Sequence, residues 1–266
     1  MSHVIAISNQ KGGVGKTTTA INLGASLAAA EKRTLIIDMD PQGNATSGLG
    51  VRGDLVKASL FGVLLDRIPL ASATIRGVHF PALDVVPTTL DLVGAESMLV
   101  HVPKREFELN NALDPLRDVY DFILIDCPPS MGLLTLNALV AADSVLIPLQ
   151  TEYFALEGLS QFSEMLHAVR QHLNPRLRIN GILPTMFDPR LKLAREVVKD
   201  AERYFGNQTL RTKIPRNVRL AEAPSFGKPA IVYDIASAGA QAYLRLAAEV
   251  IARTIGTPSD AVLASA

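Results

Sequence analysis

The chain has 266 residues, 48% of them hydrophobic and 20% charged, which excludes general disorder and is enough for one large α/β domain. Its formal net charge is zero, and Cys127 is its one cysteine, so a disulfide framework is excluded and a reducing cytoplasm is expected. No secretory pattern opens the sequence and its longest apolar runs are too short for a membrane span, so we expect a cytoplasmic protein without a membrane anchor.

Short runs rich in Val, Ile and Leu alternate along the chain with longer helical patterns. The runs are nearly continuously apolar, as expected of strands covered on both faces of a parallel sheet. The predicted strands span residues 4–8, 34–38, 83–86, 122–126, 144–148 and 179–183, with 209–214 as a further candidate. The predicted helices span residues 16–30, 59–67, 106–117, 133–141, 156–173, 191–205 and 239–255. This alternation predicts a doubly wound α/β fold with a mostly parallel sheet, helices on both faces, and ligands at the carboxyl ends of the strands.

We interpret residues 1–256 as a single domain, because no internal repeat and no low-complexity linker divides them. The last ten residues, 257–266, hold Pro, Ser and Ala without a pattern, and we expect them to form a disordered tail.

A glycine-rich loop lies between the first predicted strand and the first predicted helix. A strand, a glycine loop and a helix in this order are typical of a phosphate-binding loop rather than of a merely flexible turn. The glycines let several backbone N–H groups point at one anion, and the start of the helix adds partial positive charge. Lys16 would reach the terminal phosphates, and the Thr17 hydroxyl would coordinate Mg²⁺. We predict that eight consecutive residues bind ATP here: Lys11, Gly12, Gly13, Val14, Gly15, Lys16, Thr17 and Thr18.

Three aspartates follow predicted strands and complete this site. Asp38 and Asp40 come at the end of strand 34–38, where they can reach Mg²⁺ or an attacking water. The alternative is an Asx turn that closes the strand, because Asp, Pro, Gly and Asn all favour turns. Asp126 ends the apolar strand 122–126, as in a Walker B strand whose acid holds Mg²⁺ through a water. The predicted metal site is therefore Thr17, Asp38 and Asp126.

The loop departs from the standard phosphate-loop pattern, because Gln10 and Lys11 stand where the first glycine and its successor would be. In this deviant form the chain resembles the ParA/MinD group of ATPases, and in particular the ParA/Soj-type enzymes of chromosome and plasmid partitioning. The resemblance spans about residues 3–255, apart from 52–81. The motifs that carry it are NQKGGVGKTTTAINL, IDMDPQGNATSGLG, ILIDCPPS, EYFALEGL and IPRNVRLAEAPSFGKP.

The resemblance implies roles for individual residues. Lys11 would cross a dimer interface to the phosphates of the partner's ATP, and Asp40 would position the attacking water while Asp38 supports the site. We accordingly expect Lys11, Lys16 and Asp40 to be catalytic. Pro215 and Asn217 would lie near the adenine.

The resemblance also implies a function. ATP would drive formation of a sandwich homodimer that binds double-stranded DNA without sequence preference on the nucleoid. A centromere-binding partner of the ParB type would stimulate hydrolysis and release the DNA.

A basic segment agrees with such a DNA partner. Residues 170–228 carry 13 Lys/Arg against 5 Asp/Glu, whereas residues 1–169 carry 11 against 18. Charge alone leaves a solvated helical face as the alternative. Arg and Lys with few aromatics suit phosphate contacts better than base readout, and the resemblance implies DNA contacts for Arg190 and Arg219. The predicted DNA-binding residues are Arg190, Lys192, Arg195, Lys199, Lys213, Arg216 and Arg219.

Four other classes of protein share parts of this pattern. A membrane-surface positioning ATPase like MinD is the main alternative, although residues 251–266 form no basic amphipathic helix. A cluster-bridging electron donor like the nitrogenase iron protein needs two cysteines per subunit. A ligase or amidotransferase on the same fold would need a Cys/His pair, which we do not find. A module that binds ATP without hydrolysis would leave Lys11 and Asp40 without a task.

Overall fold

Six strands form one sheet in a computed structural model of the chain, which describes residues 1–53, 56–152 and 155–255. The predicted tail at residues 257–266 and positions 153–154 of the EYFALEGL motif lie outside the described residues. The strands are β1 (His3–Ile7), β2 (Thr34–Asp38), β3 (Leu83–Val86), β4 (Phe122–Asp126), β5 (Ser144–Gln150) and β6 (Arg178–Thr185). They pair in the order β3-β2-β4-β1-β5-β6, and each pairing is parallel. The predicted fold class is confirmed.

Helices and short 3₁₀ turns connect the strands along the described chain. The α-helices are α1 (Lys16–Ala29), α2 (Asn44–Gly48), α3 (Leu60–Leu65), α4 (Leu70–Ala73), α5 (Ala95–Leu99), α6 (Glu108–Leu113), α7 (Leu133–Ala141), α8 (Ala155–His172), α9 (Lys192–Phe205), α10 (Val218–Glu222), α11 (Ala230–Tyr233) and α12 (Ala238–Ile255). Short 3₁₀ turns are η2 (Leu90–Gly94), η3 (Arg105–Phe107), η4 (Asp114–Leu116), η5 (Gly206–Gln208) and η6 (Ala223–Phe226). No helix among the described residues is both long enough and apolar enough to cross a bilayer.

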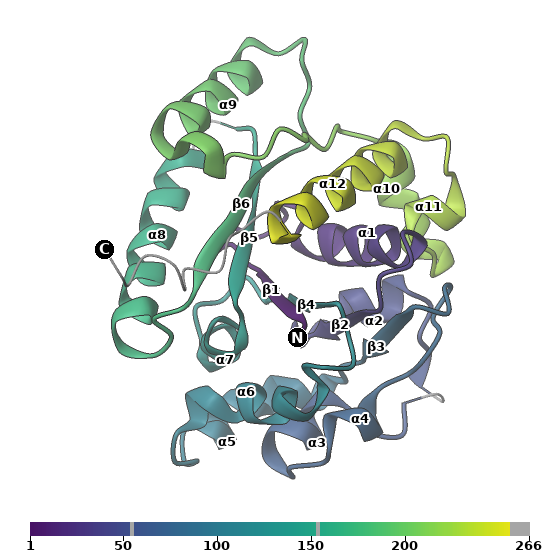
Figure 1. Cartoon of the computed structure of the whole chain (residues 1–266), viewed down its shortest axis with the longest axis vertical. Coiled ribbons are helices and arrows are strands. Elements are labelled where there is room, and N and C mark those ends of the chain that lie inside the picture. Colours follow the sequence, from purple (N-terminus) through teal and green to yellow (C-terminus); the bar gives the residue numbers. More distant parts are fainter. Residues whose placement is uncertain (54–55, 153–154, 256–266) are drawn as a thin grey trace.

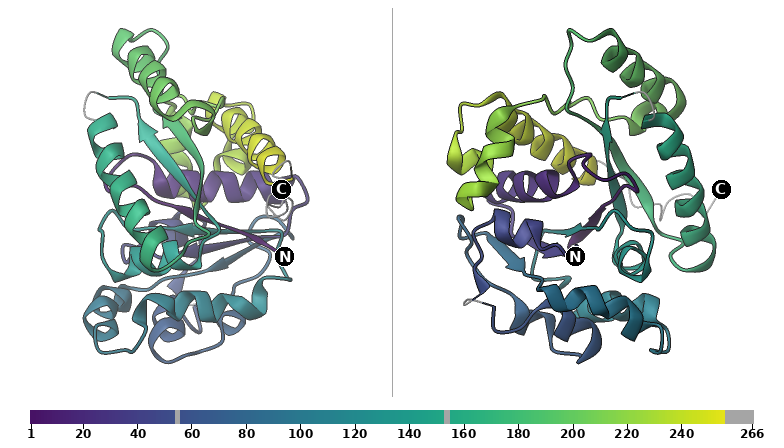
Figure 2. Two further views of the ribbon diagram at one scale, coloured as in Figure 1. Left: turned by 60° about the vertical axis from the view of Figure 1, so that its left-hand side comes forward. Right: turned by 180° about the vertical axis from the view of Figure 1, so that it is seen from behind.

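Two hydrophobic cores lie on the two faces of the sheet. Successive side chains of a strand point to opposite faces, so Val4 and Ala6 of β1 join one core while Ile5 and Ile7 join the other. Helices α3–α9 contribute to the first core, and α1, α2 and α10–α12 to the second. Figures 1 and 2 show this arrangement, with α1 and α12 packed together on one side of the strands. Burial on both faces explains why these strands read as continuous apolar runs.

Two predicted elements are wrong. Residues 209–214 form no strand. Thr209 makes an isolated bridge with Ile182, and the next residue after the segment, Pro215, makes one with Phe187. The Glu249 carboxylate accepts the backbone N–H groups of residues 211 and 212, at 2.9 Å each, so these groups are not available for a strand ladder. The single helix predicted at 106–117 is instead divided into η3, α6 and η4, because Pro115 has no N–H to continue an α-helix.

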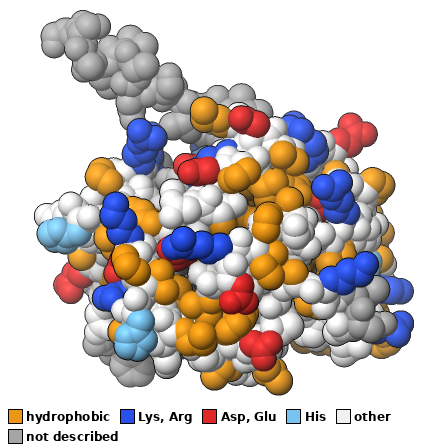
Figure 3. Space-filling model, turned by 90° about the horizontal axis from the view of Figure 1, so that it is seen from below, with side chains coloured by type: hydrophobic (Ala, Val, Ile, Leu, Met, Phe, Trp, Pro, Cys, Tyr) orange, Lys and Arg blue, Asp and Glu red, His pale blue; other side chains and the backbone are white. Residues whose placement is uncertain are grey.

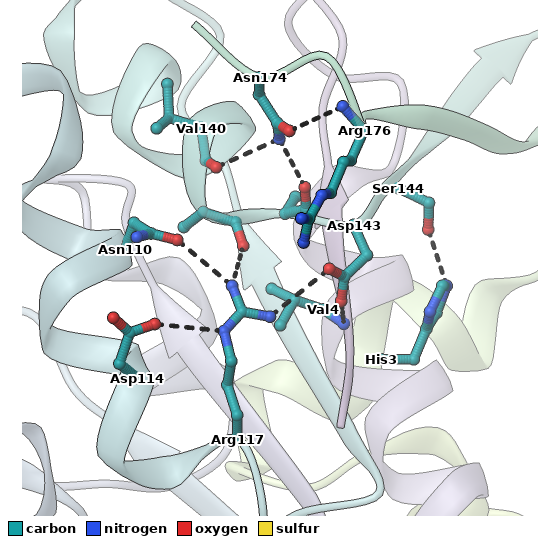
Figure 4. Close-up of polar contacts among 12 residues, drawn as sticks. His3, Val4, Asn110, Asp114, Arg117, Val140, Asp143, Ser144, Asn174 and Arg176 are labelled. Carbon is teal, nitrogen blue, oxygen red and sulfur yellow. Dashed lines mark hydrogen bonds and ion pairs between the residues drawn. The ribbon is translucent and has the colours of Figure 1, made fainter. Parts of the chain in front are cut away.

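A polar network joins several elements at the amino ends of the strands (Figure 4). The Arg117 guanidinium donates to the Asn110 side chain and to the Ala141 carbonyl, and it pairs with the carboxylates of Asp114 and Asp143. Asp143 in turn accepts the N–H of Val4 at 2.8 Å. The loop between α7 and β5 is therefore fixed to the start of β1, at the edge of the sheet opposite to the glycine loop.

The face covered by α3–α6 shows no single charge sign. Seen from below (Figure 3), acidic and basic side chains are both interspersed among hydrophobic ones. The acidic balance of residues 1–169 is thus not gathered into one acidic patch on this face.

Candidate active site

The glycine loop connects β1 to α1 at the carboxyl edge of the sheet. Gly13 and Gly15 have φ angles of 74° and 92°, a left-handed conformation that other residues adopt only with strain. Gly15 immediately precedes α1, whose first turn has neither a side-chain cap nor an acidic residue. The N–H groups of this turn are therefore free to bind an anion, as the sequence predicted.

Two residues that sequence reasoning did not single out hold the loop in place. The Asn9 side chain donates to the Pro148 carbonyl of β5 at 2.7 Å and accepts the Lys11 N–H at 3.0 Å. The Thr185 hydroxyl at the end of β6 donates to the Val14 carbonyl at 2.8 Å. Asn9 directly precedes the loop in the sequence, whereas Thr185 is brought to it by the order of the strands in the sheet.

The two lysines of the loop occupy different environments. Lys16 is buried, with 7% of its surface exposed, and its Nζ donates to the Lys11 carbonyl at 3.1 Å. Burial lowers the pKa of Lys16, while the carboxylates of Asp126 and Asp40 favour its charged form. The Lys11 side chain is exposed and forms an ion pair with Glu152 at 3.5 Å. One cation thus lies inside the loop and the other faces outward.

Asp38 and Asp126 lie side by side beneath the loop, because they are register partners at the ends of β2 and β4. Both are fully buried. The Asp38 carboxylate accepts the Thr46 N–H and hydroxyl at 2.7 and 2.6 Å. Neither oxygen of Asp126 has a hydrogen-bond partner among the described residues. The Thr17 hydroxyl lies near enough to favour the ionised form of Asp126.

Burial controls the protonation of both carboxyl groups. It raises the pKa of Asp38 to about 6, although the bonds from Thr46 oppose this shift. It raises the pKa of Asp126 well above the usual range, and the neighbouring Asp38 carboxylate adds to the effect, while Thr17 and Lys16 oppose it. A buried carboxylate without a partner is costly, so the site favours a cation beside Asp126.

These residues fit a Mg²⁺ ion held together with phosphates. Within residues 1–53, 56–152 and 155–255, no group of three or more His, Cys, Asp or Glu side chains could hold a metal ion by itself. Mg²⁺ does not require such a cage, because it keeps several waters and binds through one or two protein oxygens and substrate phosphates. The unpartnered carboxylate of Asp126 and the adjoining Thr17 hydroxyl provide that donor set.

Asp40 lies at the edge of the same site and is also buried. One of its carboxylate oxygens accepts the Gln42 N–H at 3.0 Å, so the Asx turn considered from the sequence does form. The turn and a catalytic role are compatible, because the turn uses one oxygen and holds the carboxyl group in place.

A cavity of about 240 Å³ opens beside the loop. Gly15 and Thr18 line one side of it, and Pro215 and Asn217 line the other. The structure therefore places both residues predicted near the adenine next to the phosphate loop. The Asn217 side-chain oxygen Oδ1 caps α10 by accepting the Arg219 N–H at 3.1 Å, which leaves the side-chain NH₂ group as a donor.

The predicted DNA-binding residues divide into two groups. Lys192, Arg195 and Lys199 share the exposed face of α9, whose other face is buried. Arg190, which precedes α9, pairs with Asp188 at 2.7 Å. Hydrogen bonding from Arg190 lowers the pKa of Asp188 to about 2, and the charge of Arg216 adds a smaller effect. Lys213 pairs with Glu202 of α9.

Arg219 stands apart from this group. It lies on α10 and pairs with Glu222 at 2.8 Å and with Asp234 at 3.3 Å. Figure 1 shows α9 and α10 at separate places, joined by residues 206–217. A duplex that contacts Arg219 must compete with these carboxylates for it.

Comparison with known proteins finds one family model and several relatives that are named as partitioning proteins. The AAA domain family matches residues 2–179. Chromosome partitioning protein ParA of Myxococcus xanthus is 56% identical over 253 residues, which cover 95% of this chain and 89% of that protein. Sporulation initiation inhibitor protein Soj of Bacillus subtilis is 52% identical over 252 residues, which cover 95% and 99%.

A solved structure with a similar fold is cobyrinic acid a,c-diamide synthase from Mycobacterium smegmatis with a bound ATP analogue and magnesium. It superposes with a TM-score of 0.83 at 37% identity, and the match covers 96% of both chains. Its contents agree with the ATP and Mg²⁺ predicted for this chain.

The phosphate loop, the strand-end carboxylates and the parallel sheet together define an ATP hydrolase of the P-loop class. More particularly, the chain belongs to the ParA/Soj family of partitioning ATPases. The family resemblance and the enzyme class predicted from the sequence are confirmed, and the roles of single residues stay predictions.

The raised pKa of Asp38 predicts an unusual pH dependence of stability. The pKa of Asp38 is about 6 in the folded protein and 3.8 in the unfolded chain. Ionisation of Asp38 therefore lowers the free energy of unfolding as the pH rises from 3.8 to 6, and the full loss is present above pH 6. Asp38→Asn should therefore raise the free energy of unfolding at pH 7 by roughly 1 to 3 kcal/mol, and by much less at pH 4. Urea unfolding of wild type and variant at both pH values measures this.

Asp121→Asn is the matched control with the opposite sign. Hydrogen bonding from Arg33 lowers the pKa of Asp121, so its ionised form stabilises the fold and the variant should lose stability at pH 7. If Asp38→Asn changed the free energy of unfolding equally at pH 4 and pH 7, the raised pKa of Asp38 would be contradicted.

Proposed function

We propose that this chain is a DNA-segregating ATPase that forms an ATP-bound sandwich dimer and binds duplex DNA without sequence preference. Hydrolysis, stimulated by a ParB-type centromere-binding partner, then releases the DNA. The observation that carries the proposal is the unpartnered, buried carboxylate of Asp126 beneath a loop with one buried and one exposed lysine. The names of the ParA and Soj relatives support it.

The site can receive ATP in one orientation. The base would enter the cavity between Thr18 and Pro215, and the phosphates would lie on the N–H groups of the loop and of the first turn of α1. Lys16 would neutralise the β- and γ-phosphates. When bound beside Thr17 and Asp126, Mg²⁺ would supply further positive charge to the leaving phosphate oxygens.

Hydrolysis requires a water in line with the γ-phosphorus. In this proposal Asp40 accepts a hydrogen bond from that water and so aims its oxygen at phosphorus. The new bond forms between the water oxygen and phosphorus, the bond between phosphorus and the β–γ bridging oxygen breaks, and the bridging oxygen leaves with ADP. The proton that the water loses passes to a phosphate oxygen or to solvent. Lys11 of the partner subunit would stabilise the charge that develops, as an arginine finger does in other nucleotidases.

The role of Asp40 can be separated from that of its turn. Asp40→Ala should keep ATP binding and let the dimer accumulate, while hydrolysis falls by roughly 100-fold or more. Asp40→Asn is the matched variant, because its side-chain oxygen can still accept the Gln42 N–H. Phosphate release and light scattering with ATP measure the two properties. Full activity of Asp40→Asn would show that the residue only shapes the turn.

Gly12 offers a test of the proposed dimer. A Cβ added at Gly12 meets nothing within 4 Å, and its φ is not in the left-handed region. A side chain there would meet no atom of its own chain, but it would stand between the two loops if they face each other in a dimer.

Gly12→Val should therefore fold and bind ATP but fail to dimerise. Light scattering with a non-hydrolysable ATP analogue tests this, and Gly53→Val is the control, since its added Cβ also meets nothing within 4 Å. A normal ATP-dependent dimer of Gly12→Val would contradict the facing-loop arrangement.

Binding to the DNA backbone has a specific salt signature. Arg190 and Lys192 are highly exposed, and so are Arg195 and Lys199, which suits contacts to phosphates rather than to base edges. Pairing two subunits doubles the charge that faces one duplex, so affinity should require ATP. It should also fall with salt, with a slope of about −0.9 per phosphate neutralised.

Arg219→Glu and Arg190→Glu should each weaken binding to all duplexes alike and flatten the salt slope, while dimerisation survives. Gel-shift titrations at two salt concentrations with a non-hydrolysable ATP analogue measure this. Arg33→Glu is the matched control, because Arg33 is also exposed and pairs with a carboxylate at 2.9 Å. If both charge reversals bind DNA as wild type does, the DNA surface lies elsewhere, and sedimentation with anionic liposomes then tests the MinD-like alternative.

A further inference from the structure

The cavity beside the phosphate loop has two walls from distant parts of the chain. Gly15 and Thr18, at the start of α1, form one wall, and residues 215–221, which we call the base wall, form the other. The width of the cavity therefore depends on how the base wall is held against α1. The loop glycines fix only the first wall.

The base wall belongs to a segment that is cross-linked within itself. Arg219 pairs with Asp234 at 3.3 Å, and the Tyr233 hydroxyl donates to Glu222 at 3.4 Å. The rings of Phe226 and Tyr233 stack at 5.0 Å between centroids. A contact that holds one point of residues 217–235 thus restrains the whole segment.

Asn22 provides such a contact from α1. Its Oδ1 accepts the Ala230 N–H at 2.7 Å, and its Nδ2 donates to the Thr18 carbonyl at 2.8 Å. Asn22 is 3% exposed and Ala230 is fully buried, so water cannot replace these bonds at low cost. One side chain thereby connects the start of α11 to Thr18, the residue that lines the opposite wall of the cavity.

We propose that Asn22 is a positioning residue for the adenine base, which sets the separation of the base wall from the phosphate loop. This inference rests on the proposed nucleotide site. Asn22 lies one and a half turns beyond Lys16 on α1 and does not line the cavity, so it acts through the wall and not by touching the base.

The chain contains a close geometric match to serve as control. Asn137 of α7 is also fully buried, donates to the carbonyl four residues earlier, and accepts a backbone N–H from a distant segment, that of Leu109. It lies among the elements of the other core, on the face of the sheet away from α1 and α12. Replacing it should disturb packing to a similar degree without reaching the base wall.

The test compares ATP with inorganic tripolyphosphate, which can occupy the loop but has no base. Both compete, with Mg²⁺ present, against a fluorescent ATP analogue on the full-length protein. Asn22→Leu should weaken the binding of ATP by roughly 5- to 10-fold, which is the effect of losing about one buried hydrogen bond. Its affinity for tripolyphosphate should stay at the wild-type value. Asn137→Leu should leave the ratio of the two affinities unchanged.

Steady-state hydrolysis gives an independent readout. Base contacts are equal in the ground and transition states, so Asn22→Leu should raise KM and leave kcat unchanged. Asn22→Ala removes the same two hydrogen bonds, and as the second variant it should shift the ratio of the ATP and tripolyphosphate affinities in the same direction.

The two levels of the proposal fail in different ways. A wild-type protein that binds neither ATP nor tripolyphosphate would overturn the nucleotide site itself. Wild-type binding of both, with an unchanged ratio in the Asn22 variants or with equal losses for the two ligands, would overturn the positioning role alone.

Discussion

The in-register parallel pairing of β1, β4 and β2 is the constraint on which the site depends. Because these strands run in one direction and end level with one another, the glycine loop after Ile7 and the carboxyl groups of Asp38 and Asp126 meet at one edge. A shift of one residue in β4 would turn Asp126 to the other face of the sheet. The hydrophobic residues that fill the two cores therefore also determine the geometry of the polar site.

This arrangement places several charges where water cannot reach them. Asp38 is satisfied by Thr46, whereas Asp126 has no hydrogen-bond donor and Lys16 is buried against the loop carbonyl of Lys11. Such groups cost free energy in the empty protein, and a nucleotide with its cation would relieve that cost. The instability of the empty site and the affinity for its ligand then have the same physical origin.

The parts of the fold that could be predicted are those whose signal is local. The strands 34–38, 83–86 and 122–126 and the helix 133–141 have the predicted bounds, because each is rich in apolar residues and has clear ends. The glycine loop was predictable because its chemistry requires a fixed sequence. Residues 209–214 look like a strand but bond to the Glu249 carboxylate, a residue about 40 positions away, and local pattern does not carry that information.

The site shows the same division. Lys16, Asp38 and Asp126 could be assigned a chemical role from motifs. Asn9 and Asn22 lie in the quoted motif NQKGGVGKTTTAINL, but their roles, like that of Thr185, depend on partners on other elements. The short helices α10 and α11 were also missed, since four or five residues are too few for a helical period to show.

Residues 215–235 include one wall of the proposed nucleotide site and one of the proposed DNA contacts, Arg219. Pro215, Arg216 and Asn217 line the cavity, whereas Arg219, which is half exposed on α10, does not line it. Arg219 is bonded to Asp234, which follows the helix that Asn22 anchors to α1. Both parts of this cross-linked segment are therefore held by the helix that starts at the phosphate loop. If the base enters the cavity and the DNA backbone contacts Arg219, the Arg219–Asp234 ion pair and the hydrogen bond from Ala230 to Asn22 link the two contacts through one short segment.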